Sequence, residues 1–341
     1  MYDRYTHSGE LADLEAAIAA FQQAIQATPS KSPRQPGYLS NLGIGLYDRY
    51  IRTRDLADLE AAIAAFQQAI QATTLDSPDR PARLSHLGTG LRDRYAHRGD
   101  LADLEAAIAA YQQAVQVAPS ASPRRPGYLS NLGNGLRDRY VHTASLDDLE
   151  AAIDAYQQAV QATLFTSPDR PTWLNNLGIG LHAQYTHSGE LADLEAAIAA
   201  FQQAIQTAPS NSLDQLTLLN NLGNGLSDRY AHHGDLADLE AAILVWERSW
   251  SIAQLRFGSL PVAYQLGQQR QGVGATAQLV TAYLEQAQQR HPYSSSVPPR
   301  ALEIAEGSKS RLLTQLVGRG PLPLPRGLSP EIAELEQQLL V

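Results

Sequence analysis

The strongest constraint on the fold is a phrase that recurs at intervals of about 45 residues: D-R-Y, a short turn, then L-x-D-L-E-A-A-I. The segment Leu11–Ala27 is identical to Leu56–Ala72. A fixed period of 20–50 residues indicates an array of one supersecondary unit, in which each copy buries the apolar face of its neighbour. We therefore predict a repeat array. The D-R-Y units begin at Asp3, Asp48, Asp93, Asp138 and Asp228, and Ala183 occupies the remaining slot.

Each repeat contains two apolar stripes with helical spacing. In residues 37–73 the first stripe is Leu39, Leu42, Leu46 and Tyr50, and the second is Leu56, Leu59, Ile63, Phe66 and Ile70. Steps of three and four residues are typical of a helix with one buried face. Asp55 before the second stripe is a favoured N-cap. The phrase S-P-x-x-P separates the repeats, and proline is tolerated only in the first turn of a helix. We predict an antiparallel helix pair, repeated.

Two glycines interrupt each first helix, as Gly43 and Gly45 do in G-I-G. A glycine inside a helix costs about 0.5–1 kcal/mol relative to alanine. We expect close packing at the missing Cβ to offset that cost. The alternative, a phosphate-binding glycine loop, requires a preceding strand and a third glycine, and the pattern has neither.

Composition excludes several classes of function. The net charge is −9, and the only lysines are Lys31 and Lys309, so no basic stripe for nucleic acid or anionic lipid is predicted. The absence of cysteine excludes disulfides, thiolate metal sites and cysteine nucleophiles, and it fits a cytoplasmic location. No apolar run approaches 18 residues, so we predict no membrane span. We expect no cofactor and no metal.

The repeats resemble the tetratricopeptide repeat, whose pattern is W-x2-L-G-x2-Y…A-x3-F…P. Leu39-x2-Leu42-Gly43-x2-Leu46 matches its first helix, and Ala62-x3-Phe66 matches its second. The resemblance covers about residues 1–256. These units are longer, 45 residues against 34, and we interpret the surplus as about one extra turn in both helices. The resemblance implies an all-α, right-handed α-solenoid of helical hairpins.

The S-P-D-R-P and L-A-D-L-E-A-A-I phrases are also similar to arrays that precede caspase-like CHAT peptidase domains. Residues 300–317 resemble the helical segment that leads into such a domain. The peptidase domain itself is missing, because a His/Cys dyad needs cysteine. This resemblance implies a regulatory or sensor portion of a peptidase, with the effector domain as a partner.

We predict three regions. Residues 1–256 form the array, about 5.5 units of 45 residues. Residues 257–317 form a helical C-terminal cap, and residues 318–341 form a proline-rich linker and the start of a further helix. In the last second helix, Trp246 and Trp250 replace smaller residues. Their size predicts a new packing partner in helices near 260–290 and 300–317.

The polar face of the first helices holds the candidate binding residues. In tetratricopeptide arrays this concave face holds peptides or partner helices. The asparagine amide can pair with both the N–H and the C=O of an extended peptide. Arg92 and Arg137 are the only substitutes for carboxylate-binding lysines. The alternative is that asparagine next to L-G serves helix packing. The predicted groove consists of Ser85, Thr89, Arg92, Asn131, Asn134, Arg137, Asn175, Asn176, His182, Asn220, Asn221 and Asn224.

Two other recurring sets of residues have structural explanations. A basic residue recurs at the end of each first helix, where a cation suits the helix dipole. Equivalent residues in stacked repeats are about 8–10 Å apart, too far to share a metal ion. Arg49 is predicted to pair with Asp58 or Glu60 across the hairpin rather than to serve catalysis. The basic series is His7, Arg52, His97, His142, His187 and His232.

Three functions fit this sequence. The first is a non-enzymatic scaffold that binds a protein or peptide on the concave face. The second is the regulatory portion of a caspase-like peptidase. The third is a structural spacer that self-associates, since near-identical repeats can stack end to end.

Overall fold

The computed structural model describes residues 5–6, 9–209, 214–257, 272–290 and 299–301, and the residues so described form helices and short connectors without a strand. The chain divides into two compact units, residues 1–212 and 213–341. Each unit is considered by itself. No helix in the described part of the chain is long and apolar enough to cross a membrane.

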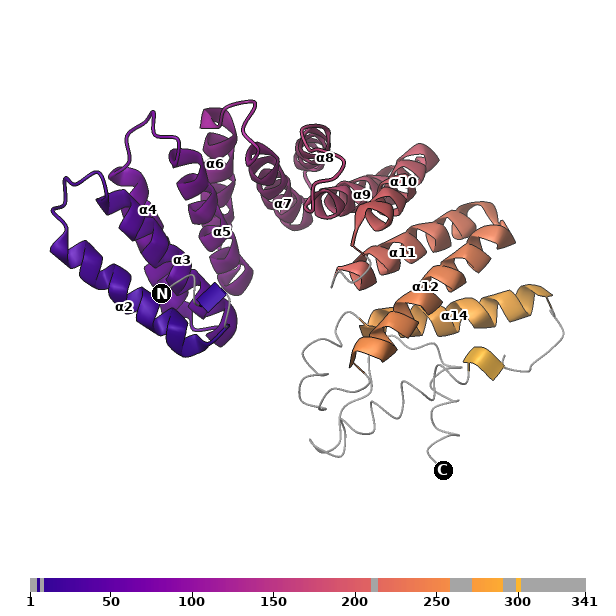
Figure 1. Cartoon of the computed structure of the whole chain (residues 1–341). Coiled ribbons are helices and arrows are strands. Elements are labelled where there is room, and N and C mark those ends of the chain that lie inside the picture. Colours follow the sequence, from indigo (N-terminus) through magenta and orange to yellow (C-terminus); the bar gives the residue numbers. More distant parts are fainter. Residues whose placement is uncertain (1–4, 7–8, 210–213, 258–271, 291–298, 302–341) are drawn as a thin grey trace. The chain divides into compact units, whose positions relative to one another are not determined.

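Unit 1 is a series of antiparallel helical hairpins (Figure 1). Each first helix has 19 residues and each second helix has 16 or 17, which confirms the all-α hairpin repeat. The helices are α2 (Leu11–Ala27), α3 (Gln35–Thr53), α4 (Leu56–Gln71), α5 (Arg80–Arg98), α6 (Leu101–Val117), α7 (Arg125–Thr143), α8 (Leu146–Gln161), α9 (Arg170–Ser188) and α10 (Leu191–Thr207).

The turn inside each hairpin is fixed by caps on both helices. Asp55 accepts a hydrogen bond from the backbone N–H of Ala57 at 2.9 Å, which confirms it as the N-cap of α4. The preceding first helix ends on a residue in the left-handed region. Glycine occupies this position in several hairpins, but Arg54 and Ala144 adopt φ of 59° and 57° there. Left-handed backbone is costly for residues with a Cβ.

The paired glycines make two different close contacts. A Cβ on Gly133 would lie 2.5 Å from the ring of Tyr156, in the second helix of its own hairpin. A Cβ on Gly135 would lie 3.0 Å from Ile108, in the second helix of the preceding hairpin. The first glycine therefore allows the aromatic core residue of its own hairpin to pack closely, and the second allows close packing of the preceding hairpin. This confirms the packing explanation of the G-x-G pattern.

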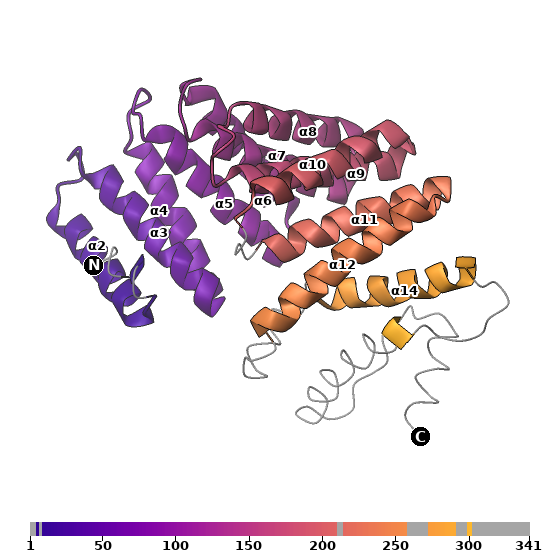
Figure 2. The ribbon, with the colours of Figure 1, turned by 45° about the vertical axis from the view of Figure 1, so that its right-hand side comes forward.

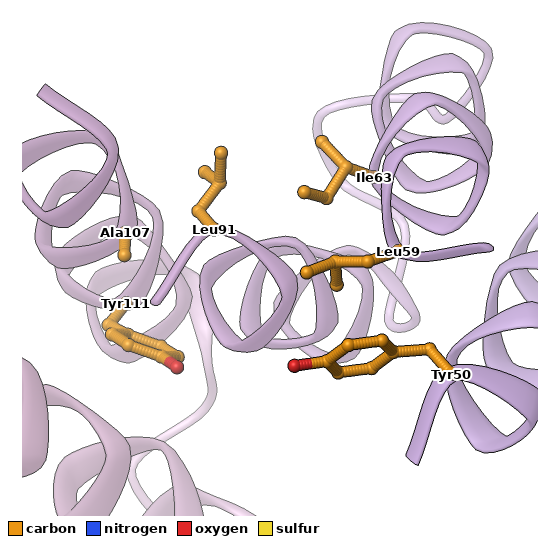
Figure 3. Packing of buried hydrophobic residues seen from close by; sticks show 6 residues of the cluster. All are labelled: Tyr50, Leu59, Ile63, Leu91, Ala107 and Tyr111. Carbon is orange, nitrogen blue, oxygen red and sulfur yellow. The ribbon is translucent and has the colours of Figure 1, made fainter. Parts of the chain in front are cut away.

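Successive hairpins share one core. Figure 3 shows six buried side chains from α3, α4, α5 and α6 that form a single cluster. Burial of this kind contributes about 25 cal/mol per Å² of apolar surface, so each hairpin depends on its neighbours for stability. The cluster consists of Tyr50, Leu59, Ile63, Leu91, Ala107 and Tyr111.

An arginine–aspartate pair joins the two helices of most hairpins. The Arg49 guanidinium donates to both carboxylate oxygens of Asp58, with Nε to Oδ2 at 2.8 Å, which confirms the predicted pair. Arg94 makes the same bidentate contact with Asp103 and also contacts Glu60 of the preceding hairpin, at 2.8 Å. Bidentate pairs of this geometry are directional and strong. They hold both the hairpin and its neighbour in register.

The α9–α10 hairpin lacks this pair. Ala183 and Gln184 stand where the other hairpins have Asp and Arg. Asp193, the counterpart of Asp58, is half-buried rather than buried, and it accepts a hydrogen bond from the Ser188 hydroxyl at 3.2 Å. Ala183 also leaves the preceding hairpin without the carboxylate that an aspartate at this position would supply.

Unit 2 contains α11 (Gln215–His233), α12 (Leu236–Phe257) and α14 (Gly272–Arg290), and α14 packs beside α12 (Figure 2). Trp246 lies against Gly223 of α11, so it takes the aromatic position that the other hairpins have.

Trp250 does meet a new partner. The Arg300 guanidinium lies 5.5 Å from the centre of the Trp250 ring, and its Nε also contacts Glu247 at 3.0 Å. The Tyr283 hydroxyl donates to Glu247 at 2.7 Å, which joins α14 to α12. The predicted linker and most of residues 300–317 lie outside the described residues, so the three-region division stays a prediction.

Candidate functional site

An amide–hydroxyl ladder runs across the first helices of unit 1. The Asn131 side chain on α7 donates to the Ser85 hydroxyl on α5 at 3.1 Å. Asn176 on α9 donates to Ser130 on α7 at 3.2 Å. Both serines are buried. The two asparagines therefore link neighbouring hairpins, which is the packing role that the sequence left open beside peptide binding.

The middle residue of G-x-G matches the aromatic residue that its hairpin buries. The Tyr156 hydroxyl donates to Asn134 Oδ1 at 2.8 Å, and the Tyr111 hydroxyl donates to Thr89 at 3.2 Å. Burial raises the pKa of Tyr111 to about 12, although the bond to Thr89 lowers it. Where the aromatic residue is phenylalanine, as at positions 66 and 201, the middle residue is isoleucine. Thr89 and Asn134 thus satisfy core hydroxyls.

His86 interrupts the ladder at the position where the other copies have asparagine. Its ring centre lies 5.5 Å from that of Phe66 on α4. Its Nδ1 is buried and has no hydrogen-bond partner among the described residues. Burial lowers the pKa of His86, and the positive charge of Arg124 lowers it further. A neutral imidazole is therefore favoured at this hairpin junction.

A second ladder crosses the first helices nearly two turns before their ends. The Tyr47 hydroxyl donates to Asp93 of the next hairpin at 2.7 Å. Burial and the bond to Asp93 both raise the pKa of Tyr47. One hairpin further on, Arg92 Nε donates to Asp138 at 2.6 Å. Burial lowers the pKa of Arg92, but the Asp138 carboxylate outweighs it, so the pKa rises and the guanidinium stays charged.

Arg137 is the next cation in this ladder, but the following hairpin has no carboxylate at the position that would pair with it. The equivalent of Asp138 in the next hairpin is Ala183. In the described part of the chain, the one ion pair of Arg137 is a long contact, 3.4 Å, with the adjacent Asp138. Asp138 already accepts from Arg92. A guanidinium has five N–H donors, so Arg137 retains hydrogen-bonding capacity.

Arg92 and Arg137 both line a pocket of about 330 Å³ between α5 and α7. The predicted groove residues that converge here are therefore the two arginines. Val141 at the rim is 76% exposed, which places apolar surface beside the charged groups. The remaining wall comes from the same two helices. The lining residues are Arg92, Asp93, Tyr95, Ala96, Arg137, Asp138 and Val141.

The other predicted groove residues lie outside this pocket. Asn175 on α9 is buried, and the His182 ring lies 6.3 Å from that of Tyr185 on the same helix. In unit 2, Asn220 accepts a hydrogen bond from the Ser249 hydroxyl at 2.8 Å. Asn221 and Asn224 are half-buried on α11. Their role in binding stays a prediction.

His7 lies outside the described residues. The other basic residues at the first-helix ends lie in the last turn, as predicted, and some of them also contact tyrosines of the preceding hairpin. Arg52 lies 5.7 Å from the centre of the Tyr5 ring. The His97 and Tyr50 rings meet edge to face at 5.7 Å, and His97 Nε2 lies 2.6 Å from the Tyr50 hydroxyl. These contacts are worth about 0.5–1 kcal/mol each. No cluster of His, Asp and Glu suited to a metal ion occurs in the described residues.

Comparison with known proteins finds one family match and several similar structures. Residues 215–249 match the family model of the tetratricopeptide repeat. The structure is similar to that of BtubC (BKLC) from P. vanneervenii, with a TM-score of 0.53 and 18% sequence identity, over 73% of this chain and 94% of that one. TTC0263, a tetratricopeptide repeat protein of Thermus thermophilus, aligns with a TM-score of 0.41 and 17% identity, over 73% and 99% of the two chains. No curated protein matches the sequence.

Proposed function

Since the chain carries a tetratricopeptide repeat and repeats the same helical hairpin along its described part, we propose that it is a non-enzymatic scaffold that binds a protein or peptide partner. The binding surface is the first-helix face of unit 1, centred on the pocket between α5 and α7. The observation that carries this proposal is Arg137, a cation whose ladder partner is replaced by Ala183.

The pocket favours a partner segment that combines a carboxylate with an apolar side chain. Arg137 supplies donors for the carboxylate, and Arg92 adds a second positive charge whose own carboxylate, Asp138, fixes its orientation. Val141 offers apolar contact at the rim. Asn131 and Asn176 position the helices rather than reaching the partner, because their amides hold serines of the preceding hairpins.

The test uses variants that alter Arg137 in opposite ways. Arg137→Ala removes the cation. Ala183→Asp supplies the missing carboxylate, which pairs with Arg137 as Asp138 pairs with Arg92. Gln184→Arg in the same hairpin is the matched control, because it adds the hairpin pair with Asp193 and leaves Arg137 unchanged.

Binding is measured by fluorescence anisotropy with labelled extended peptides that carry aspartate or glutamate beside leucine, and with their amide counterparts. We expect the acidic peptides to bind, and both Arg137→Ala and Ala183→Asp to weaken binding at least tenfold, while Gln184→Arg retains it. Equal binding by Ala183→Asp and the unchanged chain would show that Arg137 is not the anchor.

The regulatory portion of a caspase-like peptidase remains an alternative. It depends on residues 300–317, of which the structure describes 300–301. Sequencing the gene beyond the codon for Val341 distinguishes the two, since the alternative requires a peptidase domain there.

A further inference from the structure

The connectors between the hairpins of unit 1 alternate in chemical character. Each links a second helix to the next first helix, and the residue just before the first helix is alternately basic and acidic. All four of these side chains are exposed. The connectors are residues 28–34, 72–79, 118–124 and 162–169, and the alternating residues are Arg34, Asp79, Arg124 and Asp169.

Apolar side chains follow the same alternation. In the two acidic connectors, Leu75 is 80% exposed, Leu164 is 78% exposed and Phe165 is 71% exposed. The basic connectors have exposed proline and serine at the matching positions, as Pro119 and Ser120 show. A single exposed leucine needs no explanation. The connectors run along one edge of the unit 1 ribbon (Figure 1). Large exposed apolar side chains on alternate connectors therefore form a pattern along that edge.

The fold does not impose this pattern. All four connectors make the same turn, with Ser77 N bonded to the carbonyl of Thr74 at 3.2 Å and Ser122 N to that of Pro119 at 2.9 Å. The Arg80 guanidinium donates to the backbone carbonyls of Ile70 and Thr73. This contact explains why an arginine follows the acidic connector. Phe165 also lies under the Arg170 guanidinium of its own hairpin, which is 5.6 Å from the ring centre. Neither contact gives a reason for the exposed leucines at the tips.

We propose that this edge is an interface between two copies of the chain, paired in antiparallel orientation about a two-fold axis between the second and third connectors. When two copies of this series of four alternating charges run in opposite directions, each basic residue faces an acidic one. Reversal places Arg34 opposite Asp169 of the partner subunit, and Asp79 opposite Arg124 of the partner subunit. It also places the apolar tips against the prolines of the basic connectors. In a two-fold dimer, every such contact occurs twice.

Charge complementarity is the argument for a second copy as the occupant. Parallel pairing in the same register would oppose like charges at all four positions, which specific interfaces avoid. The reversed register gains four ion pairs and covers all three exposed apolar side chains. The aspartates remain available for pairing: Asp79 is 67% exposed although it contacts Arg83.

The first test reverses and then exchanges charge. The mass of the full-length chain is measured by light scattering after gel filtration, across a concentration series. We expect a dimer that does not grow further. Asp79→Arg and Arg124→Asp should each raise the dimer dissociation constant at least tenfold, because attraction becomes repulsion at two symmetric positions. The double variant Asp79→Arg/Arg124→Asp restores both pairs in the dimer and should recover the original constant.

The second test removes the apolar contact with residues that the fold already accepts. Leu75→Ser and Phe165→Ser copy the matching positions of the basic connectors, Ser30 and Ser120, so folding should persist by circular dichroism. We expect the double variant to be monomeric. Asp154→Arg, an exposed change on α8 away from the edge, is the control and should leave the mass unchanged.

Three outcomes would overturn the proposal. A monomer at every concentration would do so. Mass that increases without limit would indicate end-to-end stacking instead. A dimer that survives both charge reversals, or that the exchanged double variant fails to recover, would place the interface elsewhere.

Discussion

The pairing of Asn134 with Tyr156 predicts strong thermodynamic coupling between two residues in different helices. The Tyr156 side chain is fully buried, and its hydroxyl donates to Asn134 Oδ1 at 2.8 Å. Asn134→Ile leaves this hydroxyl without an acceptor, which should cost about 1–3 kcal/mol of stability. Tyr156→Phe leaves the half-buried amide oxygen, which water can reach, and should cost about 0.5–1.5 kcal/mol.

The double variant should recover most of this loss. Asn134→Ile/Tyr156→Phe recreates the pair at positions 44 and 66, where Ile44 packs against the cluster that contains Phe66. Replacing both partners of a hydrogen bond with apolar groups of suitable shape is nearly neutral. We therefore expect the double variant within about 1 kcal/mol of the original chain, and a coupling energy of about 1–2 kcal/mol.

The free energies of unfolding of the four proteins in this double-mutant cycle are measured by urea titration. Unfolding is monitored by circular dichroism, and the slope of free energy against urea concentration should be the same for all four. The exchange Ile179→Asn/Phe201→Tyr in another hairpin is the reverse control, and it should also be tolerated only as a pair. Independent sites add within about 0.5 kcal/mol. Coupling below that value would refute the claim that the middle residue of G-x-G is chosen to suit the buried aromatic residue.

Three further predictions concern single residues. Ala144→Gly should stabilise the chain by about 0.5–1 kcal/mol in urea unfolding, because alanine is strained at φ 57°; equal stability would mean that the turn carries no strain. Gly133→Ala should destabilise by about 1–2 kcal/mol, because its Cβ would lie 2.5 Å from a core ring, whereas Gly127→Ala, with open space around it, should not. His86 has a lowered pKa when folded, so the unfolded chain binds the proton first and stability falls as pH drops below about 6.5. His86→Asn should reduce this loss between pH 7 and 5, and parallel pH profiles for the two proteins would contradict the assignment.

Much of the candidate site is visible in the sequence, but the roles of its residues are not. Asn131, Asn134 and Arg137 are predicted groove residues because they recur on the polar face of the first helices. The structure separates their roles: Asn131 bonds Ser85, Asn134 bonds Tyr156, and Arg137 lines a pocket. A side chain on a polar helical face can point to solvent or to the adjacent helix. Spacing along one helix cannot distinguish these cases.

One signal within the sequence could have exposed the core pairs. Positions 44 and 66, with their equivalents in the other repeats, change together. Repeats with phenylalanine at position 66 have isoleucine at position 44, and repeats with tyrosine or tryptophan at position 66 have threonine or asparagine at position 44. A repeat array supplies its own set of related sequences, so such joint changes identify contacts. The replacement at Ala183 is also visible, but its effect on Arg137 is not, because the two residues lie 46 positions apart.

By itself, the sequence determined the helical hairpin, its length, its caps and the need for close packing at the glycines. These depend on local propensity and on a period repeated along the chain, and each copy reinforces the others. Only the tertiary structure decided which polar groups satisfy one another between hairpins and which cation is left beside a pocket. Those outcomes depend on how far one helix is displaced along the next, and a few ångströms decide whether an amide meets a serine or remains in water.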